Sequence, residues 1–273
     1  MNDATVATNA AAERGIEIIS RWIFNCYAVR DGGLGSPVVV DAGIESNAHD
    51  AAALTGAGDD AGIVVATHCH TDHIGAAPSL IERTRAELHI PEKARDYVAG
   101  EKPRTPDPRA MAKLWPVLLD QRFSGKALKE AGQGMKVAGY ASGDFRLPVE
   151  PAGYLADGDS LPGAPDWNVI RSPGHTDDSI SFYNTATKTL CSGDAIVSCA
   201  GRAWFNPEFC DPAQSADTEA RMRDLDVELL LPGHGTPLAG RRLLANARSF
   251  REHLPDRLAY TCKSFAAQFR RQN

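Results

Sequence analysis

The stretch at residues 67–73, Thr-His-Cys-His-Thr-Asp-His, constrains the fold more than any other part of the chain. It follows an apolar run at residues 63–66, which predicts a buried strand, and it precedes residues 74–80, which can begin a helix. Side chains two positions apart in an extended chain point the same way, so His68 and His70 can bind one ion together. Imidazole and carboxylate groups suit Zn²⁺, Mn²⁺ or Fe²⁺. The stretch therefore predicts a metal site in the loop between a strand and a helix.

The end of the same stretch indicates a place for a second ion. If the chain turns into a helix near Thr71, then Asp72 and His73 lie on the other side of the pocket from the first two histidines. The alternative is a polar loop whose histidines only form hydrogen bonds with the backbone. The chain has eight histidines in 273 residues, so this spacing is rare by chance. We therefore favour a metal site over a polar loop.

The pattern resembles that of the metallo-β-lactamase superfamily, in which His-x-His-x-Asp-His follows a buried strand. Four further segments resemble motifs of that family: residues 40–43 (Val-Asp-Ala-Gly), 173–176 (Pro-Gly-His-Thr), 192–194 (Ser-Gly-Asp) and 232–235 (Pro-Gly-His-Gly). The resemblance spans roughly residues 38–237. It implies an α/β protein with a four-layer αβ/βα sandwich and with both metals at one edge, but it does not identify the substrate.

The resemblance also implies a set of metal ligands and their roles. One ion would be held by His68, His70 and His175, a second by Asp72, His73 and His234, and Asp194 would bridge the two. Two zinc ions are expected, with iron or manganese as alternatives. A hydroxide shared by the zinc ions would be the nucleophile, and Asp72 would be the catalytic residue that orients it. Asp41 lies outside the ligand set, and we expect it to orient the ring of a ligand.

Composition and charge narrow the class of protein. A content of 43% hydrophobic and 23% charged residues is ordinary for a globular enzyme, and no apolar run is long enough to span a membrane. The net charge of −6 and the absence of a basic cluster argue against a nucleic-acid partner. Residues 1–15 lack the features of a signal peptide and predict a flexible tail, so we expect a cytoplasmic protein. Residues 16–273 would form a single domain; the sequence gives no oligomeric state.

Without a signal peptide, the six cysteines are expected to be reduced thiols. Cys69 lies between two ligand histidines, so its side chain should point away from them. We favour a buried spacer over a further type of metal ligand for this residue.

Strand and helix patterns alternate along the chain, which predicts α/β layering. Strands are expected at residues 16–29 (one or two), 38–40, 62–66, 87–90, 167–171, 179–183, 189–191 and 228–231, and helices at 49–54, 78–85, 212–225 and 241–253, with a terminal helix striped by Leu258, Cys262, Phe265 and Phe269. The segment at residues 184–187 predicts a hairpin between two of these strands.

Residues 91–150 separate the two halves of the motif set and predict a helical insertion that forms a lid. Apolar residues recur at helical spacing within residues 110–123. We expect an amphipathic helix there, with some of Met111, Leu114, Trp115 and Leu118 lining a pocket for the acyl group of the substrate.

The favoured function is hydrolysis of a small carboxylic ester, thioester or lactone, as in the glyoxalase II and lactonase branches that the chain resembles. Only about forty residues follow His234, so we do not expect the glutathione-binding tail of glyoxalase II. One alternative is an oxidoreductase similar to the persulfide dioxygenases, which residues 67–70, 193–195 and 199–202 somewhat resemble. A single iron would then be bound by His68, His175 and Asp194. Hydrolysis of a β-lactam is another alternative. A scaffold without catalysis is disfavoured because no ligand is missing.

Overall fold

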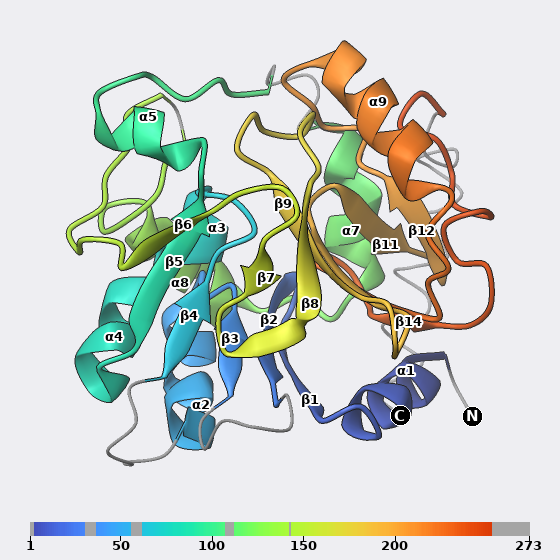
Figure 1. Cartoon of the computed structure of the whole chain (residues 1–273), viewed down its shortest axis with the longest axis horizontal. Coiled ribbons are helices and arrows are strands. Elements are labelled where there is room, and N and C mark those ends of the chain that lie inside the picture. The colour runs from blue at the N-terminus through green and yellow to red at the C-terminus, as the bar shows by residue number, and fades with distance from the viewer. Residues whose placement is uncertain (1–2, 31–36, 56–61, 107–111, 142, 253–273) are drawn as a thin grey trace.

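Two facing sheets form the centre of the fold (Figure 1). The computed structural model of the protein describes residues 3–30, 37–55, 62–106, 112–141 and 143–252. Within this part of the chain, the first sheet has the strand order β1 (Ile16–Arg21), β2 (Phe24–Val29), β3 (Val38–Val40), β4 (Ile63–Val65), β5 (Glu87–Pro91) and β6 (Gly153–Leu155). Strands β1 to β3 pair antiparallel and β3 to β6 pair parallel.

The second sheet uses strands from the C-terminal half of the chain. Its order is β14 (Leu238–Ala239), β13 (Leu229–Pro232), β10 (Thr189–Gly193), β9 (Ile180–Asn184), β8 (Ala164–Arg171) and β7 (Ser160–Leu161). Strands β10 and β13 are parallel, whereas the other neighbours are antiparallel. A separate hairpin of β11 (Ile196–Cys199) and β12 (Arg202–Phe205) follows directly after β10. The predicted hairpin between the strands at residues 179–183 and 189–191 is confirmed as β9 and β10.

Helices surround the two sheets, with α1 (Asp3–Ala12) at one end of them (Figure 1). They also include α2 (Glu45–Thr55), α3 (Thr71–Ile74), α4 (Ala77–Thr84), α5 (Ala94–Val98), the short 3₁₀ turn η1 (Ala112–Leu114), α7 (Trp115–Asp120), α8 (Gly125–Gly134) and α9 (Pro212–Met222). No helix in the described ranges has both the length and the apolar character needed to cross a membrane.

The burial of alternate side chains explains the layers. In β3, Val38 and Val40 join an apolar cluster that also contains residues of the second sheet, such as Phe182. Val39 points the other way and joins a cluster with Leu80 of α4 and alanines of α2. A third cluster packs the opposite face of the second sheet against residues that include Met222 of α9. The order helix, sheet, sheet, helix confirms the predicted four-layer sandwich.

The prediction of a flexible tail at residues 1–15 is wrong for most of that segment. Helix α1 occupies Asp3–Ala12, and its Ala7 and Ala11 are buried against strands of both sheets. These alanines are four positions apart and therefore share one face of the helix. Alanine has the highest helix propensity of all residues, and burial of this small face holds the helix in place.

The helix predicted at residues 241–253 is also absent where the structure describes it, up to residue 252. The segment forms turns, and the backbone of Arg248 pairs with β12, donating to Ala203 O and accepting from Phe205 N. Leu244 and Phe250 are still buried, as their apolar spacing suggests. Pairing with a distant strand therefore replaces the local helix. The predicted terminal helix with Leu258 and Phe269 lies outside the described residues.

Candidate metal centre

The predicted ligand side chains converge at one edge of the two sheets, although they come from distant segments. His68 and His70 lie in the loop after β4, Asp72 and His73 on α3, His175 in the loop after β8, Asp194 directly after β10, and His234 after β13. Parallel strands end at the same edge of a sheet, which explains why β10 and β13 bring their following residues together. All seven predicted residues occur in sets whose ligand atoms lie within 4.8 Å of one another: His68 with His70 and His175, His68 with His73 and Asp194, and Asp72 with His73 and His234.

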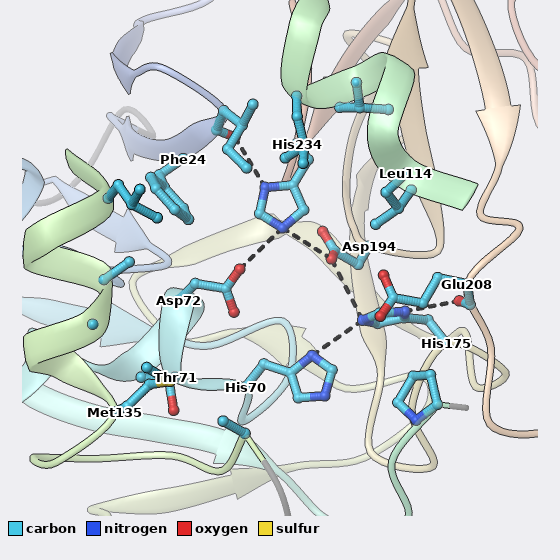
Figure 2. Close-up of a pocket in the computed structure, with 18 of the residues that line it drawn as sticks. Phe24, His70, Thr71, Asp72, Leu114, Met135, His175, Asp194, Glu208 and His234 are labelled. Atoms are coloured by element: carbon cyan, nitrogen blue, oxygen red, sulfur yellow. Dashed lines mark hydrogen bonds and ion pairs between the residues drawn. The ribbon is translucent and has the colours of Figure 1, made fainter. Parts of the chain in front are cut away.

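Three histidines form the first group. His70 Nδ1 lies 3.1 Å from His175 Nε2 (Figure 2). It also lies 3.1 Å from His68 Nε2. His68 is fully buried and His175 is almost so. Three nitrogens that face one point are a donor set suited to a transition metal.

The second group is formed by Asp72, His73 and His234. His234 Nε2 lies 3.1 Å from Asp72 Oδ2 (Figure 2), and the rings of His73 and His234 have their centroids 5.3 Å apart. The side chain of Asp72 is 30% exposed, whereas that of His73 is 1% exposed. Asp72 is thus the member of this group that has most access to solvent.

Asp194 lies between the two groups. One of its oxygens, Oδ2, is 3.5 Å from His175 Nε2 and 3.2 Å from His234 Nε2. The other, Oδ1, is 3.5 Å from His73 Nε2. The side chain is 2% exposed, so this carboxylate is directed at the histidines and away from bulk water. Its position is the one that the resemblance implied for a bridging ligand.

Three rings are held from behind by hydrogen bonds at Nδ1. His73 Nδ1 is 2.9 Å from Asp41 Oδ2, His234 Nδ1 is 2.9 Å from Ile23 O, and His175 Nδ1 is 2.9 Å from Glu208 O. Because each acceptor is a carboxylate or a carbonyl, each Nδ1 donates a proton, and Nε2 is left to face the centre. The expected contact of Asp41 with a ligand ring is therefore present.

Burial and charge set opposite protonation states in the cluster. Burial, reinforced by neighbouring histidines, lowers the pKa of His70 to about 3 and lowers the pKa of His68 well below its usual range. Burial alone would also lower the pKa of His73, but the carboxylates of Asp194 and Asp41 raise it to about 10. His68 and His70 therefore present free nitrogens, whereas His73 holds a proton that a metal would displace.

Burial and neighbouring charges also oppose each other at His234, Asp72 and Asp194. Burial lowers the pKa of His234, but Asp194 and Asp72 outweigh it and raise the value well above the usual range. Burial raises the pKa of both carboxyls, yet their histidine neighbours, His234 foremost, bring each below its usual value. Asp72 and Asp194 are therefore anionic at neutral pH.

A metal ion would satisfy buried polar atoms that have no hydrogen-bond partner among the described residues. His73 Nε2 and Asp194 Oδ1 are buried, and neither atom has a hydrogen-bond partner among the described residues. A buried polar atom without a partner is unfavourable, and a cation between these two atoms would satisfy both. A donor set of imidazoles and carboxylates matches zinc, iron or manganese.

Steric contacts explain why position 233, in the second Pro-Gly-His segment, is a glycine. A Cβ added at Gly233 would lie 2.6 Å from His73 Cε1, and it would overlap Asp194 Oδ1 as well. Only a residue without a side chain therefore allows the loop after β13 to approach the cluster so closely.

Cys69 lies away from the donor groups, in agreement with a buried spacer. Its side chain is fully buried in the apolar cluster between the first sheet and its helices. Its backbone N donates to Asp178 Oδ2 at 2.7 Å, while the hydroxyl of Tyr140 donates to Asp178 Oδ1 at 2.8 Å. The Tyr140 ring packs edge-on against His70, with centroids 4.7 Å apart. Asp178, which no sequence motif identified, thus fixes the loop that carries the first two histidines.

No sequence motif identified Asn206 or Glu208 as residues of the site. The Asn206 amide donates to Asp194 O at 2.8 Å and the Glu208 backbone accepts from His175. Both follow the β11–β12 hairpin, where no strands were expected from the sequence. The Asn-Pro-Glu segment matches no motif, and its place depends on that hairpin.

A cavity of about 590 Å³ opens over the cluster (Figure 2). Its walls come from the β1–β2 turn, the predicted insertion and the ligand loops, and most of the side chains are apolar. They include Trp22, Ile23, Phe24, Leu114, Val117, Leu118, Leu128 and Met135 beside His70, Asp72, His175, Asp194, Glu208 and His234. None of the described residues that line the cavity is a lysine or an arginine.

The helix predicted at residues 110–123 is shorter than expected. The described part contains η1 and α7, and Pro116 occupies the first turn of α7, where a missing N–H is tolerated. Leu114 and Leu118 line the cavity as predicted. Trp115 does not: it is 45% exposed and lies outside the cavity lining, so it is not one of the members of the set that form the pocket. Met111 lies outside the described residues.

Comparisons with known proteins agree along most of the chain. The family model of the metallo-beta-lactamase superfamily matches residues 21–234. The probable metallo-hydrolase YflN of Bacillus subtilis is 26% identical over 278 residues, which cover 91% of this chain and 92% of that protein. The hydroxyacylglutathione hydrolase of Hydrogenovibrio crunogenus is 30% identical over 122 residues, covering 44% of this chain and 42% of that protein.

Solved structures share the fold at low sequence identity. TTHA1623, crystallised in a di-iron-bound form, is 23% identical with a TM-score of 0.50, over 82% of this chain and 93% of that chain. ST1585 from Sulfolobus tokodaii, described as an archaeal metallo-beta-lactamase superfamily protein, is 19% identical with a TM-score of 0.51, over 83% of this chain and 82% of that chain.

Proposed function

Because this chain belongs to the metallo-β-lactamase superfamily, we propose that it is a metal-dependent hydrolase that uses two zinc ions to cleave a small carboxylic ester, thioester or lactone. Similarity to a probable metallo-hydrolase over 92% of that protein supports metal-dependent hydrolysis. The observation that carries the proposal is the convergence of three donor groups around His73 Nε2 and Asp194 Oδ1, which are buried without hydrogen-bond partners among the described residues.

The proposed ligand sets follow the two groups described above. One ion would be held by His68, His70 and His175 and the other by Asp72, His73 and His234, while Asp194, whose carboxylate lies beside histidines of both groups, could serve either ion. When bound, such ions lower the pKa of water toward ~7 and stabilise the negative charge that develops on a carbonyl oxygen. Iron or manganese would suit the same donors, and zinc is our choice because its catalytic sites use such sets of histidines and carboxylates.

Asp72 has a role of its own in the proposed reaction. Its Oδ2 lies beside His234, and its carboxylate also lines the cavity (Figure 2). The low pKa of this carboxyl keeps it ionised. The second oxygen can accept a hydrogen bond from an attacking water and orient it toward the carbonyl of the substrate.

The cavity favours an acyl substrate of modest size. Its walls are mainly Trp22, Phe24, Leu118, Leu128 and Met135, which suit an apolar chain. Neither the lining described here nor the net charge of −6 offers a basic surface for nucleic acid.

The alternative with a single iron leaves part of the cluster without a purpose. An iron bound by His68, His175 and Asp194 would not use the complete group of Asp72, His73 and His234. Residues 199–202, which suggested that alternative, lie at the turn of the β11–β12 hairpin, and none of them lines the cavity. We therefore favour two ions.

A substrate panel on zinc-loaded protein tests the proposal. We expect hydrolysis of at least one class among carboxylic esters, thioesters and lactones, and little hydrolysis of β-lactams. His70→Ala should lose at least one ion and most activity, because the first group loses a donor. His49→Ala is the matched control, since the His49 side chain is 66% exposed on α2. No hydrolysis of any acyl compound, combined with oxygen consumption by iron-loaded protein on a persulfide, would overturn the proposal.

A further inference from the structure

Glu208 is a largely buried residue of the cavity wall, and its carboxylate has no partner among the residues that the structure describes. Glu208 is 7% exposed and lines the cavity above the metal-binding cluster. Its carboxylate forms no hydrogen bond or ion pair with any residue that the structure describes, although its backbone forms two. Figure 2 shows this carboxylate beside the His175 ring, where it faces the cavity.

The surrounding hydrogen bonds hold Glu208 in that position. Its backbone N donates to Asn206 Oδ1 at 2.9 Å, and its backbone O accepts from His175 Nδ1 at 2.9 Å. Asn206 in turn donates to Asp194 O at 2.8 Å. The Glu208 backbone is therefore anchored to the cluster, and its side chain lines the cavity that opens over the cluster.

A carboxylate in such surroundings needs a donor. A substrate that fills the cavity would remove this carboxylate from water, which is unfavourable without a hydrogen bond, and the described lining supplies no lysine or arginine. Glu208 also belongs to none of the three groups whose ligand atoms converge. A donor that arrives with the substrate would satisfy the carboxylate, while Leu114 and Leu118 contact the apolar remainder of the ligand.

We propose that Glu208 is a specificity-determining residue, which accepts a hydrogen bond from a hydroxyl or ammonium group that the acyl substrate carries near its scissile carbonyl. This inference rests on the proposed acyl-ester hydrolysis for the identity of the substrate. An unsubstituted acyl chain would fill the same cavity but would leave the carboxylate unpaired. The preference for a donor-bearing substrate should therefore depend on this one side chain.

Binding of inert ligands tests the inference separately from catalysis. The probes are three methyl ketones of equal chain length: one unsubstituted, one with a β-hydroxyl and one with a β-ammonium group. Calorimetry gives their dissociation constants for zinc-loaded wild type, Glu208→Gln, Glu208→Leu and the control Glu17→Gln, which changes an exposed glutamate of β1. Metal content and thermal unfolding are measured on every preparation.

We expect wild type and Glu17→Gln to bind at least one donor-bearing ketone about 10- to 100-fold more tightly than the unsubstituted one. Glu208→Leu should abolish this preference without loss of metal. Glu208→Gln keeps an acceptor oxygen, so it should lose the ammonium preference and retain much of a hydroxyl preference. The donor-bearing ketone that wild type binds more tightly identifies whether the substrate carries a hydroxyl or an ammonium group.

Three results would overturn the inference: equal binding of all ketones by wild type, a preference that survives in Glu208→Leu, or loss of metal in Glu208→Gln, which would make Glu208 a ligand. If the protein hydrolyses esters but binds all three ketones equally, this inference is wrong and the proposed function still stands. A Glu208-dependent ketone preference in a protein that hydrolyses no ester supports the binding role and removes the proposed function instead.

Discussion

Asp41 accepts a hydrogen bond from His73 Nδ1 at 2.9 Å, and both side chains are almost fully buried. The same carboxylate accepts the backbone N–H of Thr67 at 2.8 Å. Asp41 has a φ of 60°, a left-handed conformation that aspartate and asparagine tolerate better than most residues. Through these contacts the end of β3 sets both the orientation of a ligand ring and the start of the loop that carries the first two histidines.

Asp41→Asn should weaken metal binding about 10- to 100-fold, because the ring loses its charged acceptor while the backbone conformation stays accessible. The measurement is a competition titration with a chelator. Asp50→Asn, which changes a partly exposed carboxylate on α2, is the control and should bind metal as wild type does. Equal affinities for both variants would show that Asp41 does not support the site.

Gly233→Ala should remove metal from the second group, because the added Cβ overlaps Asp194 Oδ1 and approaches His73 Cε1 to 2.6 Å. Metal content per chain measures the effect. Gly125→Ala is the control, since a Cβ there would meet only Phe123 Cε1 at an ordinary 3.8 Å. Full metal content in Gly233→Ala would mean that the loop after β13 moves without harm to the ligands.

The seven residues that converge in the cluster could be selected from the sequence because they lie in short local motifs. His68, His70, Asp72 and His73 are adjacent in the chain, and the motifs at His175, Asp194 and His234 follow predicted strands. The signals for the buried strands were equally local, as the run of three valines in β3 illustrates. These features require no knowledge of distant contacts.

The features that were missed depend on distant contacts. Helix α1 is fixed by burial of Ala7 and Ala11 against strands from elsewhere in the chain. Residues 241–252 form turns in place of a helix, and Arg248 among them pairs with β12. Glu208 reaches the cavity because the β11–β12 hairpin and Asn206 place it there. Local pattern and propensity carry no information about such pairings.

Leu118→Ala should change the preference for acyl chain length, because Leu118 lines the cavity and trimming it enlarges the pocket. A change of ~1–3 kcal/mol in discrimination is expected for a contact of this size. Trp115→Ala on the same helix is the matched control, since Trp115 is 45% exposed and outside the lining. Measurements of kcat/KM across short and long esters test the pair. A larger change in Trp115→Ala would reverse our assignment of the two faces of α7.

The two groups should differ in the protons that they release on binding metal. In metal-free protein at neutral pH, His73, with a pKa of about 10, holds a proton that an ion must displace, whereas His70, with a pKa of about 3, is already free. Affinity for the second ion should therefore rise by about tenfold per pH unit for each displaced proton over roughly pH 6 to 8, and affinity for the first ion should rise less. Calorimetry in buffers of different ionisation enthalpy counts the protons. Equal release for both ions would contradict these opposite shifts.

Anomalous diffraction from crystals of zinc-loaded protein locates each ion without assuming a substrate. We expect two zinc peaks, one among His68, His70 and His175 and one among Asp72, His73 and His234, with Asp194 beside both. A single peak, or a peak outside these groups, would contradict this expectation.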